Sequence, residues 1–224
     1  MVLQAVIPKS YYLIQSPYHT FQLKELTTTV TVTIPEGNYS ATSFKTAVQA
    51  LLIAASPNLW TYSIGYSSLL GKFTYTVTGN SGQPSIICAN PSQVYEQLGF
   101  EPSSTNVFVA NSLVSTNVIK LQSEDSLYLH SDMVTNGDDN VLQEIFVSGS
   151  SDYSNIKYQC IDVVACSKEI AFNNSNVFRF HLTSEDDHDI NLNGLNIVFS
   201  LLMYKKDDTN LMIRDGIKLL AGGK

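Results

Sequence analysis

The chain has 224 residues, of which 44% are apolar and 15% charged, and its formal net charge is −7. This composition excludes an intrinsically disordered chain, and the length suits one large β domain or one domain with an insertion. Because an acidic protein is poorly suited to neutralising phosphates, we expect no direct nucleic acid binding. We also expect no secretion signal and no membrane span, since the first residues lack a positive region and a long apolar core.

The first strands are expected at Tyr11–Ile14 and in the threonine-rich run that ends at Ile34. Val30, Val32 and Ile34 alternate with threonines, which is the period of a strand with one buried face. Pro35 removes a backbone donor, so we expect the second strand to stop there.

An amphipathic helix is expected next, with Ser40 as its N-cap. Apolar residues then recur at helical spacing on one face. These residues are Phe44, Ala47, Val48, Leu51 and Leu52. Pro57–Asn58 should end the helix.

Two aromatic runs follow, joined by the short turn 67–71, and together they predict a β-hairpin. The aromatic residues are Trp60, Tyr62, Tyr66, Phe73 and Tyr75. They could form a platform that stacks carbohydrate or bases, but alternate positions of a strand are normally core, and we favour packing. A second short helix is expected from Asn90–Pro91, with Gly99 as its C-terminal stop.

The remaining chain reads as short strands separated by polar turns, beginning with the poorly bounded stretch 105–121. The expected strands are Ser126–His130, Val141–Ser148, Ile156–Cys166, Val177–Thr183 and Leu195–Tyr204. The last is nearly continuously apolar, which is typical of a central strand covered on both faces. The pattern predicts a mainly β chain folded as a sandwich or jelly roll.

No recognised nucleophile, phosphate-binding or zinc motif is present, so we expect no enzyme and no catalytic, cofactor-binding or metal residues. The acidic loop 185–193 contains Asp189-x-Asn191-x-Asn193-Gly194, the first half of a calcium loop. Ser200 stands where the bidentate acid is required, so a solvated acidic loop is the preferred interpretation.

Cys88, Cys160 and Cys166 are too few and too widely spaced for a disulfide framework. Cys160 and Cys166 are expected on one face of one straight strand, where distance would bar a bridge. We therefore expect thiols in a reducing cytosol. His130 and His181 are expected in strands as polar-face or half-buried residues, with a pH switch at a subunit contact as the alternative.

Several motifs, in their order along the chain, resemble minor capsid proteins of virophages, Polinton-like viruses and related large eukaryotic double-stranded DNA viruses. The motifs are Ile34–Ser40, Gly71–Thr76, Gln97–Phe100, Leu127–Asp132, Val141–Phe146 and Asp189–Gly194. They extend over about 11–204. The resemblance implies a single jelly-roll capsid domain over residues 1–204, with a helix-hairpin-helix insertion at about 35–104 and a C-terminal tail at 205–224.

Within this group the chain looks most like the penton, the vertex protein. The resemblance then implies a homopentamer at icosahedral fivefold vertices, in contact with major capsid protein capsomers. It also implies a place in the virion capsid and assembly inside the host cell, in a cytoplasmic virus factory. The alternatives are another minor capsid protein, or a receptor-binding spike or fibre head that uses loops 136–140 and 148–155.

The C-terminal residues Leu220–Lys224 resemble the Leu-x-Gly-Gly-x sites cut by adenovirus-type cysteine proteases of this virus group. A loose Gly-Gly tail is an equally good interpretation.

Overall fold

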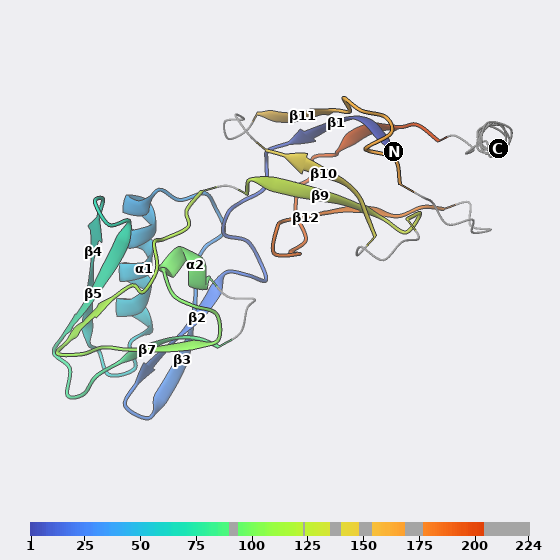
Figure 1. Cartoon of the computed structure of the whole chain (residues 1–224). Helices are drawn as coiled ribbons and strands as arrows, with labels where there is room; N and C mark the ends of the chain where they lie inside the picture. The colour runs from blue at the N-terminus through green and yellow to red at the C-terminus, as the bar shows by residue number, and fades with distance from the viewer. Residues whose placement is uncertain (90–93, 123, 135–139, 148–153, 169–176, 204–224) are drawn as a thin grey trace, which may run out of the picture. The chain divides into compact units, whose positions relative to one another are not determined.

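The structure is a computed structural model that describes residues 1–89, 94–122, 124–134, 140–147, 154–168 and 177–203 (Figure 1). The chain divides into two compact units. We call Tyr11–Ser123 the central unit, and Met1–Ser10 with Glu124–Lys224 the terminal unit. The predicted tail 205–224 lies outside the described residues.

The central unit contains two antiparallel sheets. Among the described residues the first has the strand order β3-β2-β6-β7 and the second the order β4-β5-β8. The strands of the first sheet are β2 (Thr20–Glu25), β3 (Thr28–Thr33), β6 (Ser85–Cys88) and β7 (Ser104–Val107). Those of the second are β4 (Thr61–Ser67), β5 (Lys72–Thr78) and β8 (Ser112–Val114).

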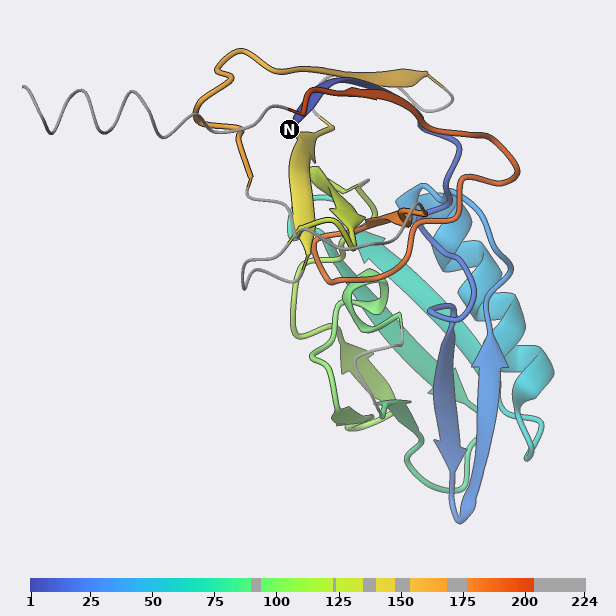
Figure 2. The ribbon, with the colours of Figure 1, turned by 90° about the vertical axis from the view of Figure 1, so that its right-hand side faces the viewer.

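Helix α1 (Ala41–Ala55) lies beside the β4–β5 hairpin in both ribbon views (Figures 1 and 2). Its N-terminus is a capping box: the Ser43 backbone N donates to Ser40 Oγ at 3.2 Å, and the Ser40 N donates to Ser43 Oγ at 2.9 Å. Every fourth residue on one face is buried, at Phe44, Val48 and Leu52. The predicted cap, face and end of this helix are confirmed.

Short helix α2 (Tyr95–Leu98) ends at Gly99, whose φ of 79° is the left-handed conformation that a C-terminal stop requires. The predicted stop is confirmed, whereas the predicted start at Asn90–Pro91 lies outside the described residues. Stacked aromatic rings fill the core between these elements, including Phe44 on Phe73 at 6.0 Å and Tyr75 on Phe100 at 5.7 Å between centroids.

The terminal unit is built from two antiparallel sheets that lie one over the other (Figure 1). Among its described residues the strand orders are β11-β1-β13 and β10-β9-β12. The strands are β1 (Val2–Pro8), β9 (Ser126–Ser131), β10 (Val141–Phe146), β11 (Asn155–Gln159), β12 (Phe180–Thr183) and β13 (Val198–Leu201). The mainly β prediction is confirmed.

Four predicted strands need correction. The predicted strand Val177–Thr183 begins only at Phe180. The opening strand is Val2–Pro8, while Ile14 of the predicted strand Tyr11–Ile14 makes only an isolated bridge with Gly37. The predicted strand Ile156–Cys166 stops at Gln159, where the chain turns back. The predicted strand Leu195–Tyr204 is reduced to Val198–Leu201.

That last strand is not covered on both faces. Within the described part of the chain β13 pairs with β1 on one side, and Val198 is 67% exposed. Each residue of 195–203 is exposed or half-buried, so this apolar run does not form a buried central strand. The predicted segment 35–104 also shares a sheet with earlier residues, because Ile86 of β6 pairs with Leu23 of β2.

Candidate functional site

One end of the central unit exposes a cluster of large apolar side chains, which we call the leucine patch: Leu69, Leu70 and Val118. Leu69 is 91% exposed and Leu70 58%, both on the turn between β4 and β5. Val118 is 63% exposed and lies close to the same turn, since a Cβ on Gly71 would come within 2.8 Å of its Cγ1. The Ile119 N–H donates to the Gly71 carbonyl at 2.9 Å, which holds the two segments together.

The terminal unit exposes a second cluster, which we call the Ile161 turn: residues 161–164, directly after β11. Ile161 is 99% exposed, Val164 81% and Val163 44%. In the sheet that contains β11, Val6 of β1 and Val198 of β13 are cross-strand partners and both are exposed.

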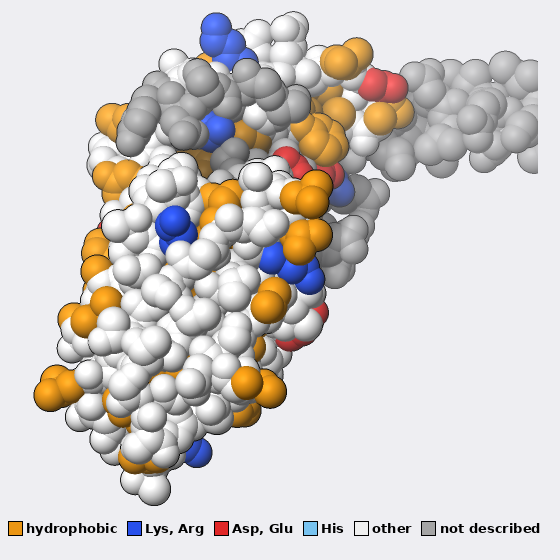
Figure 3. All heavy atoms as spheres, turned by 90° about the vertical axis from the view of Figure 1, so that its left-hand side faces the viewer, with side chains coloured by type: hydrophobic (Ala, Val, Ile, Leu, Met, Phe, Trp, Pro, Cys, Tyr) orange, Lys and Arg blue, Asp and Glu red, His pale blue; other side chains and the backbone are white. Residues whose placement is uncertain are grey.

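Charged residues are few in this chain, at 15% of the sequence. Figure 3 shows one face on which uncharged side chains predominate, with apolar side chains scattered among them and few charged ones. A surface of this kind gains free energy on contact at roughly 25 cal/mol per Å² of apolar area buried. Apolar centres with uncharged polar rims are what protein interfaces use.

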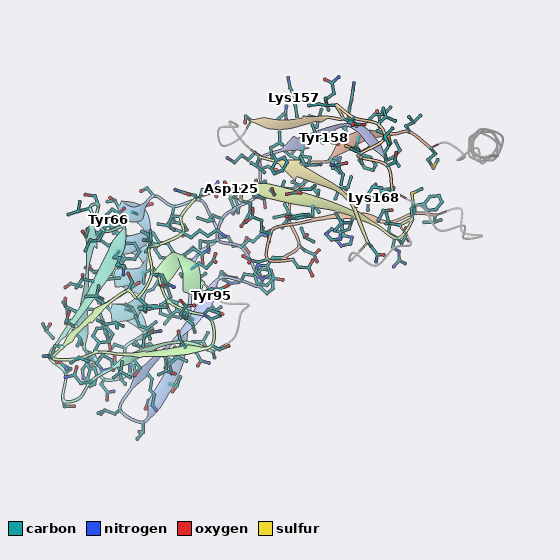
Figure 4. The ribbon with its side chains drawn as sticks, viewed as in Figure 1. Tyr66, Tyr95, Asp125, Lys157, Tyr158 and Lys168 are labelled. Carbon is teal, nitrogen blue, oxygen red and sulfur yellow. The ribbon has the colours of Figure 1, made fainter. Side chains whose placement is uncertain are left out.

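The aromatic hairpin is core, as the sequence interpretation favoured. Trp60, Tyr62 and Tyr75 are all 3% exposed or less. Tyr66, labelled in Figure 4, is 39% exposed, and its ring packs against Phe73 at 5.6 Å. The hairpin therefore offers one accessible ring, not a platform for successive sugars or bases.

Sequence reasoning missed a buried carboxylate at the end of β2. Glu25 is fully buried, and its oxygens accept hydrogen bonds from Ser56 Oγ at 2.7 Å and Tyr62 Oη at 2.7 Å. They also accept from the Asn58 backbone N at 3.0 Å and from Asn58 Nδ2 at 3.1 Å. Burial, together with the hydrogen bond to Glu25 and its charge, raises the pKa of Tyr62 well above its ordinary value.

The signal for this carboxylate is present in the sequence. Phe21 and Leu23 point inward on β2, and Glu25 occupies the next inward position. An acid at the end of an inward series predicts a buried polar group that needs donors. The arrangement is structural, because these donors saturate the carboxylate.

The two strand histidines lie opposite one another on β9 and β12. Their rings stack with centroids 4.7 Å apart, and His130 Nε2 lies 2.9 Å from Thr183 Oγ1. His130 is buried and His181 is exposed. The predicted strand positions are confirmed, and the pH switch at a subunit contact stays a prediction.

The acidic loop uses its amides to hold its own backbone. Asn191 Oδ1 accepts from the Asn193 N at 2.9 Å, and Asn193 Nδ2 donates to the Ser10 carbonyl at 2.5 Å. In the described ranges, no three His, Cys, Asp or Glu side chains gather closely enough to hold a metal ion. Neither described helix has the length and apolar character needed to cross a membrane.

The cysteines occupy two different environments. Cys88 is buried on β6, and burial raises the pKa of its thiol to about 12. Cys160 and Cys166 are half-buried in the terminal unit. They do not share a straight strand as predicted, because β11 ends before them and the chain folds back.

No protein family and no curated protein matches this sequence. Among solved structures, the chain is similar to the crystal structure of the selenomethionine-labelled mavirus penton protein, with a TM-score of 0.45 and 13% identity. The match covers 84% of this chain and 78% of that chain. A similarity of this extent assigns neither a family nor a function.

Proposed function

We propose that this chain is a structural capsid subunit of a eukaryotic double-stranded DNA virus, and specifically the penton that forms homopentamers at icosahedral fivefold vertices. In this proposal residues 1–204 form one jelly-roll capsid domain that carries the helix-containing insertion at about 35–104. The ordered series of motifs that resembles minor capsid proteins supports the proposal.

The observation that carries the proposal is the pair of exposed apolar clusters on a mainly β framework. Burying a Leu or Ile side chain contributes about 1.5–3 kcal/mol, so the leucine patch and the Ile161 turn can each drive association. The cores beneath them are closed, since Phe73 and Tyr75 of the central unit and Leu127 and Leu129 of the terminal unit are nearly inaccessible. A stable β framework that exposes apolar side chains on its turns is suited to subunit contacts.

The partners follow from this role. The chain would bind copies of itself and major capsid protein capsomers, and would not bind the genome directly because its net charge is −7. It would act in the virion capsid after assembly inside the host cell, and would have no enzymatic activity.

Size-exclusion chromatography with light scattering tests the proposal. We expect the full chain to form a pentamer, and we expect Leu69→Glu and Ile161→Glu to shift it toward monomer because each places a charge inside a buried contact. Thr31→Glu is the matched control, since Thr31 is exposed on β3 and belongs to neither cluster. A wild-type chain that stays monomeric or forms a trimer at high concentration would contradict the pentamer.

The same measurement separates the alternatives. A trimer would indicate another minor capsid protein. A receptor-binding head would need a ligand surface, and the burial of the hairpin aromatics removes the stacking platform that the sequence offered for one. We therefore expect no binding on a glycan array that depends on Tyr66.

A further inference from the structure

A tight turn after β11 brings two cysteines back toward the same strand. The Cys160 N–H donates to the Leu3 carbonyl at 2.8 Å, which holds Cys160 beside β1. The Cys166 N–H donates to the Asp162 carbonyl at 3.1 Å and closes one helical turn. Cys160 therefore directly follows β11, and Cys166 ends the helical turn that begins two residues later at Asp162.

Asp162 stabilises this turn from within. Its Oδ1 accepts hydrogen bonds from the backbone N–H of Val164 at 2.9 Å and of Ala165 at 3.1 Å. A side chain that caps successive N–H groups in this way holds a short turn in place.

The turn contacts Tyr158, the β11 residue labelled in Figure 4 beside its neighbour Lys157. Tyr158 Oη donates to Cys166 Sγ at 3.6 Å. Cys160 lies two residues beyond Tyr158 and is still held beside β1, and burial alternates so that Ile156, Tyr158 and Cys160 share one face of this segment. Both cysteines are half-buried, so a small reagent can reach them.

We propose that Cys160 and Cys166 form a reversible intramolecular disulfide, made by exchange with a small-molecule disulfide such as oxidised glutathione. The thiolate of one cysteine attacks a sulfur of oxidised glutathione, forms a mixed disulfide and releases one glutathione thiolate. The thiolate of the second cysteine then attacks the first protein sulfur, so that the internal S–S bond forms and the second glutathione leaves. The protein loses two protons and two electrons, and glutathione disulfide is reduced to two thiols.

The surroundings set the pH dependence of this step. Partial burial and the neighbouring Cys166 thiol raise the pKa of Cys160. Exchange requires the thiolate, so the rate of oxidation should increase as the pH rises above neutrality. Cys88 should not react, because it is buried on β6 with a raised pKa.

The disulfide would close a ring around the Ile161 turn, whose Ile161 and Val164 side chains are the most exposed apolar groups of that segment. A ring reduces the number of conformations open to the turn. Oxidation would therefore make the apolar surface of the turn more rigid. This inference does not depend on the proposed capsid function.

The test uses the full chain incubated with oxidised glutathione, followed by alkylation of the remaining thiols, intact-mass measurement and peptide mapping. The alkylation is carried out in denaturant so that buried Cys88 becomes accessible. We then expect the mass of the reduced chain minus two hydrogens plus one alkyl group, with the mapped link joining Cys160 to Cys166 and the alkyl group on Cys88. Dithiothreitol should reverse the change. Disulfide formation by oxidised glutathione should also be faster at higher pH.

Two variants are matched controls. Cys88→Ser should form the link as the wild type does. Cys166→Ser should instead accumulate a stable mixed disulfide with glutathione on Cys160, because the resolving thiol is gone. The proposal is overturned if the wild type accumulates that same mixed disulfide, if the link forms between two chains, or if both wild-type thiols remain fully alkylable.

Discussion

Glu25 is a buried acid that joins separate segments of the central unit. Its carboxylate is buried. Its oxygens accept hydrogen bonds from the Ser56 hydroxyl, the Tyr62 phenol and two N–H groups of Asn58. These donors come from the segment after α1 and from β4, so one side chain of β2 joins three parts of the unit. A carboxylate suits this site because it offers acceptors alone.

Replacing Glu25 with glutamine tests that interpretation. Glu25→Gln keeps the shape but turns one acceptor into an NH₂ group that faces donors, which should lower the free energy of unfolding by about 2–4 kcal/mol. Urea unfolding measures the loss. Glu101→Gln is the control, because the exposed Glu101 accepts from Asn117 Nδ2 at 2.7 Å and should change stability by about 0.5 kcal/mol or less. Equal losses of unfolding free energy for Glu25→Gln and Glu101→Gln would show that the buried network stabilises the fold no more than an exposed hydrogen bond does.

At the scale of the element, the sequence predicts structure well where the signal is local. Helix α1 begins at the Ser40 capping box and the short helix α2 stops at Gly99, because both features satisfy backbone groups within a few residues. The hairpin of β4 and β5 follows from alternation on both sides of a turn. Each of these needs no distant partner.

Prediction failed where a distant partner decides the end of an element. Strand β11 ends at Gln159: Cys160 still donates its N–H to the Leu3 carbonyl, and the chain then turns at 162–166. The sequence beyond Gln159 remains rich in Ile, Val and Cys and so suggested a longer strand. The hydrogen-bond network of Glu25 was not predicted for a related reason, since its donors lie more than thirty positions away along the chain.

A glycine pair tests how the end of α2 is held. Gly99 has φ of 79°, and a Cβ there would come within 2.7 Å of Ser115 Cβ and 2.8 Å of the Asn117 carbonyl oxygen. Gly79 has φ of 73°, yet a Cβ there would meet nothing within 4 Å. Gly79→Ala should therefore cost about 1–2 kcal/mol from backbone conformation alone.

Gly99→Ala carries the same conformational cost and adds overpacking against backbone, which typically costs a further 1–3 kcal/mol or so. Urea midpoints of the two variants against the wild type give the comparison. If Gly99→Ala proves no more harmful than Gly79→Ala, the contact between the end of α2 and residues 115–117 is looser than the structure shows.

At the scale of the whole molecule, the two units differ in how the chain builds them. The buried core that surrounds Phe73 and Tyr75 draws all its members from 11–123, which is one continuous stretch. The terminal unit instead needs the first residues of the chain, because β1 is the middle strand between β11 and β13. Local patterns could not predict this division, since β1 pairs with residues that follow the entire central unit.

The division predicts that fragment 11–123 folds alone, while a chain lacking 1–10 has a damaged terminal unit. The fragment keeps its whole core and the Glu25 network, so it should unfold cooperatively in urea and show near-ultraviolet circular dichroism from its packed aromatics. Glu25→Gln should lower the stability of the fragment by the same amount as in the full chain, because every partner of Glu25 named above is retained. A fragment without a cooperative transition would show that the central unit needs contacts from outside 11–123. If Glu25→Gln lowers the free energy of unfolding by different amounts in the fragment and in the full chain, residues outside 11–123 contribute to its effect.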